Sequence, residues 1–449
     1  MTIPAAIFKA YDVRGIYPTE VNAAVAQRIG AALVEQLGAR RVAVGGDPRP
    51  SSPELGEAFA AGAAGAGAQV IDLGAIATEM LYFAVADGGL DGGAMVTASH
   101  NPRQYNGMKL VAQGALPLSG EQGMPELCRR VLEMAEPPLA AAPWTERRDV
   151  YDDYVEHLLS TVDADAFSPF RVVMDAANGI AGKLAAKVFD RTTVERVEMY
   201  FEVDGTFPNH EPNPLLEENS REICERVVAE KADLGIAWDG DADRCFFIDE
   251  NGEFVPGDFV TALLAEALLR KNPGASILYD LRASRAVPEI VLQNGGVPLI
   301  NRVGHAFFKQ RMRREEILFG GEVSGHYYFR ANHNADSGFI PALLILELLS
   351  QKKATLAELL EPLRSKYFIS GEINSKVDDV AAALTRLESR FADGKMSTLD
   401  GISIDYPDWH FNVRPSNTEP LLRLNLGAVD RDLMEEKRDL VLSVILQGV

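Results

Sequence analysis

A pattern of strand, loop, helix and second strand occurs three times along the chain, and it restricts the folds that the chain can adopt. Each copy begins with an apolar strand, at 40–44, 171–175 and 276–280, followed by a loop that carries Asp or Gly. A helical stretch and a second strand come next. Parallel strands need a crossover connection, which is usually a helix, so the pattern predicts βαβ units with parallel pairing. We therefore expect three related α/β domains.

The last part of the chain alternates differently and predicts a smaller α+β domain with an antiparallel sheet. It contains helical stretches near 380–391 and from Arg431 onward. A Pro/Ala-rich segment at 136–148 is typical of a linker, and a turn at 250–252 ends another unit. These boundaries predict an α/β domain I at 1–150, an α/β domain II at 151–251, an α/β domain III at 252–367 and an α+β C-terminal domain at 368–449.

Composition and charge exclude several classes of protein. The chain has 449 residues, with 44 Lys and Arg against 65 Asp and Glu, and a net charge of −21. Proteins that bind nucleic acid usually carry a basic surface, so we expect no nucleic-acid partner. Three isolated cysteines exclude a disulfide framework and a structural zinc site. No secretory signal and no apolar run long enough for a membrane span are visible, so we expect a cytoplasmic protein with no membrane partner.

The string Thr97–Pro102 follows the predicted strand 93–96 and contains Ser99. A serine at the carboxyl end of a strand lies where open α/β sheets bind ligands, and it can act as a nucleophile or carry a phosphoryl group. Lys109, shortly after it, supplies a point charge for an anion. The same string also fits a Ser/Asn-Pro turn in which Ser99 bonds only the local backbone.

A second string, Asp239–Arg244, places carboxylates at 239, 241 and 243 between two apolar segments. Carboxylates at alternate positions can direct their oxygens at a hard cation such as Mg²⁺. The string overlaps a calcium loop, but its sixth position is Arg244 where that loop needs Gly, and strands flank it in place of helices. An acidic solvated turn is the alternative.

Two further strings have residues that suit a sugar phosphate. In Gly320–His326, Glu322 and Ser324 can bond hydroxyls, and His326 titrates near neutrality. In Arg414–Pro420, a guanidinium, hydroxyls and an amide can surround a phosphate. Each string taken alone also fits an ordinary loop.

All four strings, in this order, resemble the α-D-phosphohexomutase superfamily, and specifically its bacterial phosphomannomutase/phosphoglucomutase branch. The resemblance extends over nearly the whole chain, since the segments 8–15, 46–49 and 204–210 match as well. It implies three related α/β domains and a C-terminal domain around a central cleft, which agrees with the pattern above.

The resemblance also implies roles for individual residues. It places a phosphoserine at Ser99, with Mg²⁺ held by Asp239, Asp241, Asp243 and a phosphoserine oxygen, and with Arg244 in support. It implies sugar contacts by Glu322 and Ser324, and phosphate contacts by Arg414, Ser416, Asn417 and Thr418. Lys109 and His326 are candidate acid and base groups. Arg14 and His100 are further expected catalytic residues, and Tyr11, Arg282, Gly304 and His305 are expected to bind the substrate.

The activity that the resemblance implies is interconversion of hexose 1-phosphate and hexose 6-phosphate, of mannose, glucose or both. Ser99 would give its phosphoryl group to the free hydroxyl, and a hexose 1,6-bisphosphate would serve as intermediate and activator. We therefore expect phosphorylated hexoses as substrates and a monomer or a dimer.

Two positions depart from common family patterns. Glu79 stands where many relatives have Pro, as in one phosphomannomutase subgroup. Val323 occupies the variable middle of the sugar string, where phosphoglucosamine mutases usually carry Gln. Phosphoglucosamine mutase is therefore the alternative within the family. An Asp-dependent Mg²⁺ phosphatase and a cation-binding protein without activity are alternatives outside it.

Overall fold

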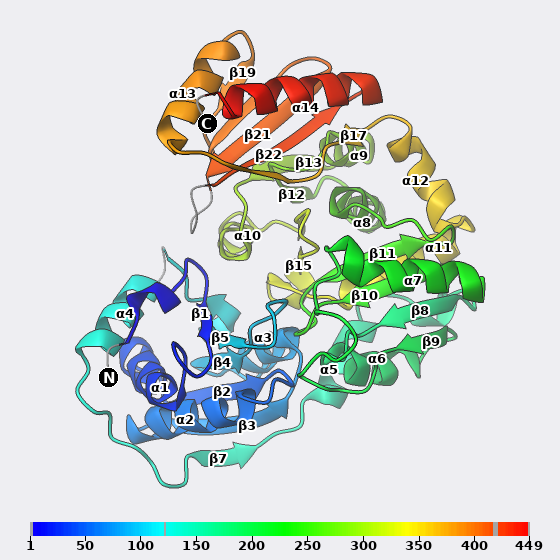
Figure 1. Cartoon of the computed structure of the whole chain (residues 1–449). Coiled ribbons are helices and arrows are strands. Elements are labelled where there is room, and N and C mark those ends of the chain that lie inside the picture. The colour runs from blue at the N-terminus through cyan, green and yellow to red at the C-terminus, as the bar shows by residue number, and fades with distance from the viewer. Residues whose placement is uncertain (1–2, 121–122, 416–420, 448–449) are drawn as a thin grey trace. The chain divides into compact units, whose positions relative to one another are not determined.

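The computed structural model describes residues 3–120, 123–415 and 421–447 (Figure 1). Two compact units make up the chain, and each is described by itself. The first unit contains Met1–Val255, Phe308–Leu318 and Ser324–Leu356, and the second contains Pro256–Phe307, Phe319–Val323 and Ala357–Val449.

The first sheet, in the first unit, has the strand order β1-β5-β4-β2-β3-β7, with β6 beside β5. Its central strand β2 pairs in parallel with β3 and β4, and β4 pairs antiparallel with β5. The strands are β1 (Val13–Ile16), β2 (Arg41–Gly46), β3 (Gln69–Ala75), β4 (Gly92–Val96), β5 (Tyr105–Ala112), β6 (Leu116–Pro117) and β7 (Trp144–Arg147). The 3₁₀ helices η1 (Ala5–Ile7) and η2 (Gln113–Ala115) and the helices α1 (Ala23–Leu37), α2 (Ser52–Gly65), α3 (Thr78–Asp87) and α4 (Met124–Glu133) accompany it.

Helices α1 and α2 lie side by side (Figure 1), and small residues make their close contact possible. A Cβ atom added to Gly30 of α1 would lie 2.1 Å from the carbonyl oxygen of Phe59 in α2. Only glycine tolerates such an approach of two backbones. Helix α1 begins after Asn22, whose side chain accepts a hydrogen bond from the N–H of Val25. Helix α2 begins with Ser52 and has a proline in its first turn.

The second sheet repeats this arrangement in the order β11-β10-β8-β9. Its central strand β8 pairs in parallel with β9 and β10, and β10 pairs antiparallel with β11. The strands are β8 (Arg171–Asp175), β9 (Glu195–Met199), β10 (Leu234–Trp238) and β11 (Cys245–Asp249). The helices of this region are α5 (Tyr151–Leu159), η3 (Ala164–Ala166), α6 (Ala181–Phe189) and α7 (Glu217–Glu230).

The third copy lies in the second unit, where β12 pairs in parallel with β13 and β14. These strands are β12 (Ser276–Asp280), β13 (Val297–Asn301) and β14 (Phe319–Gly321), and the helices α8 (Gly257–Lys271) and α9 (Ala286–Gln293) belong to the same unit. Helix α10 (His305–Arg314) begins in the second unit, and from Phe308 onward it belongs to the first. In the first unit, β15 (Tyr327–Phe329) pairs antiparallel with β16 (Ala335–Asp336), with η4 (Arg330–Asn332) between them and α11 (Ile340–Lys352) after them.

The C-terminal part of the second unit is an antiparallel sheet in the order β17-β22-β21-β20-β19, with β18 beside β22. Two helices pack on it, and apolar residues of both helices and the sheet form one core. The elements are α12 (Leu356–Arg364), β17 (Phe368–Ile369), β18 (Ile373–Lys376), α13 (Val380–Arg390), β19 (Lys395–Ser397), β20 (Ile402–Asp405), β21 (Trp409–Pro415), β22 (Leu421–Ala428) and α14 (Arg431–Ile445).

The predicted fold class is confirmed: three related α/β arrangements are followed by a smaller α+β domain. Two local expectations need correction. The segment 136–148, predicted as a linker, contains strand β7, which pairs in parallel with β3. The third-copy strand expected at 317–319 begins only at Phe319. In the described part of the chain, no helix has both the length and the apolarity that crossing a membrane requires.

Candidate active site

The loops that carry three of the predicted strings occupy equivalent positions in the fold. Ser99 follows β4, Asp239 follows β10 and Glu322 follows β14. Each of these strands pairs in parallel with the central strand of its own sheet. Open α/β sheets bind ligands at the carboxyl ends of such strands, so the threefold pattern explains why each loop is placed to meet a ligand.

Ser99 is buried and has a left-handed backbone, with φ of 50°. Its Oγ donates a hydrogen bond to Oδ2 of Asp239 over 2.8 Å, and its N–H donates to Oγ1 of Thr97. A Cβ atom added to Gly240 would lie 2.8 Å from the carbonyl oxygen of Ser99. Glycine at position 240 therefore allows close contact between the serine loop, Thr97–Pro102, and the aspartate loop, Asp239–Arg244.

Asp239, Asp241 and Asp243 are all buried, and a carboxylate oxygen from each lies within 4.8 Å of the others. Oδ1 of Asp241 and Oδ1 of Asp243 are buried and have no hydrogen-bond partner among the described residues. Burial, together with repulsion from the other two carboxylates, raises the pKa of Asp239 well above its usual range. Buried oxygens without a donor and a carboxyl group that resists ionisation both fit a site for a divalent cation.

Lys109, on β5, offsets part of this negative charge. Its ammonium group forms ion pairs with Asp241, at 2.7 Å, and with Asp243. Burial alone would lower the pKa of Lys109, but the two carboxylates raise it above its usual range. Thr78 donates a hydrogen bond to the same Asp241 oxygen over 2.6 Å. Lys109 is therefore held as a fixed positive charge.

Arg14 borders the serine loop. Arg14 of β1 donates to the carbonyl oxygen of Ala98 and, over 2.6 Å, to Oδ1 of Asn101. Asp12 forms an ion pair with it. These contacts place one guanidinium directly against the loop that carries Ser99.

Arg244, at the end of the aspartate loop, contacts two imidazoles. Its Nη2 donates to Nδ1 of His100 over 2.7 Å, and its Nε donates to Nε2 of His326 over 3.3 Å. Its Nε also lies 3.5 Å from Oδ2 of Asp239. Burial and the nearby Arg244 lower the pKa of His100 well below its usual range, so this imidazole is neutral. Nδ1 of His100 lies 3.3 Å from Oγ of Ser99.

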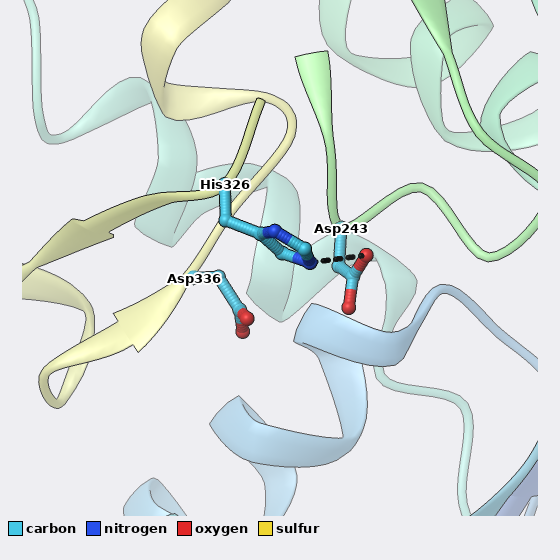
Figure 2. A group of neighbouring side chains, drawn as sticks. All are labelled: Asp243, His326 and Asp336. Carbon is cyan, nitrogen blue, oxygen red and sulfur yellow. Dashed lines mark ion pairs between the residues drawn. The ribbon is translucent and has the colours of Figure 1, made fainter. Parts of the chain in front are cut away.

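Figure 2 shows His326 with its ring directed at Asp243, and Asp336 beside them. Nε2 of His326 lies 3.7 Å from Oδ1 of Asp243, and its Nδ1 lies 3.1 Å from Oγ of Ser324. Asp336 forms a fully buried ion pair with Lys309 over 2.9 Å. The sequence did not single out Asp336 or Lys309. A basic residue within the Arg-rich helix α10 is typical of a surface position, so its burial could not be predicted from its neighbours in the sequence.

The second unit holds the first part of the sugar string, up to Val323, whereas Ser324 and His326 belong to the first unit. Glu322 is buried, and its Oε2 accepts a hydrogen bond from the N–H of Gly304 over 2.9 Å. Arg282 pairs with Asp280 at 2.7 Å and lies 3.8 Å from Glu322. The N–H of Val323 donates to Asp280 over 2.8 Å. The loops after β12 and β14 are thus tied together through one Asp and one Arg.

Arg414, on β21, shares the carboxylate of Glu372 with Arg423. The distances to Glu372 are 2.7 Å from Arg414, 3.4 Å from Arg423 and 3.9 Å from Arg282. Nε of Arg414 and Nε of Arg423 are buried without a hydrogen-bond partner among the described residues. Glu372 is a neighbour that the sequence did not indicate. Three predicted phosphate contacts, Ser416, Asn417 and Thr418, lie outside the residues that the structure describes.

The structure therefore places the predicted residues in two groups. One group surrounds Ser99 in the first unit and comprises Arg14, Ser99, His100, Lys109, Asp239, Asp241, Asp243, Arg244, Ser324 and His326. The other lies in the second unit and comprises Arg282, Gly304, Glu322 and Arg414. Tyr11 is half-buried in the turn before β1, and His305 is the first residue of α10. The roles of all these residues stay predictions.

Comparison with known proteins gives a consistent result along the chain. The family models "Phosphoglucomutase/phosphomannomutase, alpha/beta/alpha domain I", "domain II" and "domain III" match residues 5–136, 152–252 and 256–367, and the corresponding "C-terminal domain" matches 372–443. A protein of Xanthomonas campestris named "Phosphohexose mutases" is 45% identical over 100% of both chains. An Escherichia coli "Phosphomannomutase" is 43% identical over 98% of both chains.

A crystal structure of a phosphoglucomutase/phosphomannomutase family protein from Burkholderia thailandensis has the same fold. It superposes with a TM-score of 0.90 at 33% identity, over 100% of this chain and 99% of the other. The fold and these relatives define an enzyme class, the mutases that transfer phosphoryl groups. The chain belongs to the phosphoglucomutase/phosphomannomutase family, and it is a mutase.

Proposed function

We propose that this mutase interconverts hexose 1-phosphate and hexose 6-phosphate, with mannose or glucose as the sugar, through a phosphoserine at Ser99. The observation that carries the proposal is the contact of Ser99 Oγ with Asp239, 2.8 Å away, inside a buried cluster of three carboxylates. A serine in that position can hold a phosphoryl group whose charge a bound cation and nearby basic residues balance.

Mg²⁺ is the cation that the donor set suits, because it prefers carboxylate and phosphate oxygens to nitrogen or sulfur. Asp239, Asp241 and Asp243 would hold it, and when bound it neutralises charge that develops on the transferring phosphoryl group. The buried Oδ1 atoms of Asp241 and Asp243, which lack donors among the described residues, support this assignment.

Each step of the proposed reaction transfers one phosphoryl group between Ser99 and the sugar. A hydroxyl oxygen of the substrate forms a bond to phosphorus as the bond from phosphorus to Ser99 Oγ breaks. The hydroxyl proton leaves to a base, and Ser99 Oγ takes up a proton and becomes a hydroxyl group again. The product is a hexose 1,6-bisphosphate, which turns end for end and returns its other phosphoryl group to Ser99. Arg14, Lys109 and Arg244 lie next to the serine and aspartate loops and supply fixed positive charge throughout.

Lys109 suits the part of a fixed cation better than that of a base. Two carboxylates raise its pKa, so its ammonium group does not readily give up a proton. His326, which contacts Ser324, Arg244 and Asp243, stays our candidate for proton transfer.

Further groups, in the sugar string and in the second unit, suit the rest of the substrate. Glu322 and Ser324 are proposed to bond sugar hydroxyls, with Arg282, Gly304 and His305 beside the sugar string. Arg414, together with Ser416, Asn417 and Thr418, is proposed to bind the phosphate that does not react. The buried Nε donor of Arg414 supports this part, because a guanidinium with a free edge is suited to a phosphate.

The names of the relatives favour mannose over glucosamine as the sugar, since several are phosphomannomutases. The side chain of Val323 has no group that could bond an amino substituent. We also propose that the enzyme acts in the cytoplasm as a monomer or a dimer, without nucleic-acid or membrane partners, in line with its charge of −21.

The test is a coupled assay of mannose, glucose and glucosamine 1-phosphates with Mg²⁺ and the matching 1,6-bisphosphate. We expect turnover of the mannose or glucose ester, and loss of at least about 10⁴-fold in Ser99→Ala because the covalent route disappears. Ser220→Ala, a buried serine of α7, is the control and should retain activity. Mass spectrometry should find phosphate on Ser99. Release of inorganic phosphate without interconversion, with phosphate on an aspartate, would instead identify a phosphatase.

A further inference from the structure

The central strand of each α/β copy ends at an aspartate that makes the same turn. Asp47 after β2, Asp175 of β8 and Asp280 of β12 each accept, through Oδ1, a hydrogen bond from the N–H two residues later, at 3.0, 2.8 and 2.7 Å. In two copies the later residue is an arginine that also pairs with the aspartate, namely Arg49 and Arg282. The Asp-x-Arg unit is therefore a repeated part of the fold.

Arg49 directs its guanidinium into the protein and is fully buried. Its Nε donates to Oδ2 of Asp47 over 3.0 Å. Its Nη2 donates to the carbonyl oxygens of Ser99, at 2.9 Å, and Asn101, at 2.6 Å, and its Nη1 donates to those of Pro102 and Tyr105, at 2.9 and 3.2 Å. A guanidinium has five N–H bonds, and these contacts occupy all of them. Four of the five acceptors are carbonyl oxygens of the segment that carries Ser99.

Asp47 holds the same segment from its other end. Its Oδ2 accepts from Oγ1 of Thr97 over 2.8 Å and from the N–H of Ala98 over 3.4 Å. Thr97 Oγ1 in turn accepts from the N–H of Ser99 over 2.8 Å. The ion pair thus holds the segment on both sides of Ser99. The Asp47 carboxylate contacts the residues before Ser99, and the Arg49 guanidinium contacts Ser99 and the residues after it.

These contacts of Asp47 and Arg49 matter because Ser99 is held in an unfavourable backbone conformation. A φ of 50° is uncommon for residues other than Gly, and such conformations persist only where the surroundings over-determine them. With the backbone in this conformation, Ser99 Oγ lies 2.8 Å from Asp239. The carbonyl group of Ser99 itself is one of the groups that Arg49 fixes.

A loop of the second α/β copy covers this arginine. A Cβ atom added to Gly205 would lie 2.1 Å from the carbonyl oxygen of Pro48, so this loop lies directly on the Asp47–Arg49 turn. The ring of Phe207 lies over the guanidinium, 4.9 Å from its Cζ atom. Water is excluded from Arg49, and its hydrogen bonds to the serine loop are correspondingly strong.

We propose that Arg49 is a positioning residue for phosphoryl transfer: through the carbonyl groups of Ser99 and Asn101 it holds Ser99 in the left-handed conformation that directs Oγ at Asp239. The inference rests on the proposed function, because it gives Ser99 the phosphoryl group. Arg282 fills the equivalent position in the third copy, where it lies against Glu322 and Glu372. The same Asp-x-Arg turn thus supports the serine loop in one copy and the sugar string in another.

The test compares Arg49→Lys with Arg313→Lys. Lysine keeps the positive charge beside Asp47 but cannot bond four carbonyl groups at once. Arg313 is the matched control, since it too donates to backbone carbonyls, those of Gly114, Ala115 and His333, without contacting Ser99. We expect kcat of Arg49→Lys to fall on the order of 100-fold, because small displacements of a reacting group cost about that much. KM should change by less than about threefold, because the phosphate and sugar contacts are intact.

A purely structural role would give a different result. If kcat of Arg49→Lys stays within about threefold of the wild type, or if Arg313→Lys loses as much, the proposal is wrong. Should Arg49→Lys not fold, as judged by circular dichroism, Arg49→Gln makes the same comparison, because its planar amide keeps two donors without the charge. A rise in KM that accounts for the whole loss would also overturn the proposal.

Failure of the inference can be told apart from failure of the proposed function. If the wild type interconverts hexose phosphates and Arg49→Lys does so equally well, only the inference fails. If the wild type does not interconvert them, the proposed function fails. Transfer of phosphate from glucose 1,6-bisphosphate to Ser99, followed by intact mass, then still compares the two proteins. Absence of phosphate on Ser99 of the wild type overturns both.

Discussion

The aspartate loop of the first unit and the arginine cluster of the second unit, which is Arg282, Arg414 and Arg423 around Glu372, are both charged. Both contain buried polar atoms without a hydrogen-bond partner among the described residues, but of opposite kinds. In the aspartate loop the buried atoms without a partner among the described residues are acceptors, Oδ1 of Asp241 and Oδ1 of Asp243. In the arginine cluster they are donors, Nε of Arg414 and Nε of Arg423. Buried polar atoms are costly unless something pairs with them. The first region is therefore suited to a cation and the second to an anion.

The carboxyl groups of the two regions show the same contrast. Burial and neighbouring carboxylates raise the pKa of Asp239. Burial would also raise the pKa of Glu372, but Arg414, Arg282 and Arg423 together lower it. A protein with a net charge of −21 thus provides both a negative and a positive binding region. If the substrate is the anion of the proposed function, the two regions would serve different ends: one would transfer a phosphoryl group and the other would hold one.

The largest effect should come from removing charge in the aspartate loop. We expect Asp241→Asn, or treatment of the wild type with EDTA, to lower kcat on the order of 1000-fold, since the cation supplies several kcal/mol of stabilisation to the transferring group. A second measurement does not depend on activity: MgCl₂ should raise the melting temperature of the wild type and not that of Asp241→Asn, because a ligand stabilises the fold it binds. Asp72→Asn, in β3, serves as control. An equal shift in both proteins would remove the contrast between the two regions.

A smaller effect should come from the arginine cluster. We expect Arg414→Ala to lower kcat/KM about 100-fold, mainly through KM, since charge-assisted bonds to phosphate contribute about 1.5–3 kcal/mol. Arg386→Ala is the control, because Arg386 bonds only the carbonyls of Val444 and Ile445 in the contacts described. Steady-state kinetics with hexose 1-phosphates measures the split. A loss confined to kcat would show that Arg414 acts on the chemical step and not on binding, and the proposed difference between the two regions would be wrong.

The smallest effect concerns Glu79, a fully buried acid of α3 whose Oε2 accepts from the N–H of Gly338 over 3.1 Å. Burial raises the pKa of Glu79 to about 8. In the unfolded chain its pKa is ordinary, so between about pH 4.5 and pH 8 the folded state binds more protons, and stability falls as the pH rises through that range. Glu79→Gln should flatten this dependence and add on the order of 2 kcal/mol to the free energy of unfolding at pH 8.

Urea unfolding at pH 5 and pH 8 measures the difference, and Glu388→Gln on the exposed face of α13 is the control. If Glu79→Gln follows the wild type at both pH values, the carboxyl groups near the aspartate loop do not share the behaviour of Asp239. The contrast would then be confined to the loop itself.

Strand and helix periodicity, with the four strings, made most of the fold and the central residues predictable. The strands at 171–175 and 276–280 occur where the pattern indicated them. Strand β7 could not be predicted within a Pro/Ala-rich segment, because only its partner β3 makes it a strand. Local alternation is readable from neighbours in the sequence, whereas pairing depends on residues far along the chain.

The sequence by itself determined the kind of groups available: a serine, three aspartates and several arginines on loops at the ends of parallel strands. Only the tertiary structure decided which of them are buried and what they touch. Lys109 became a partner of two aspartates, and Arg49 became the support of the serine loop. The physical reason is that charge and chemistry belong to a side chain, while burial, pKa and hydrogen bonding belong to its surroundings. Those surroundings form only when distant segments of the chain pack together.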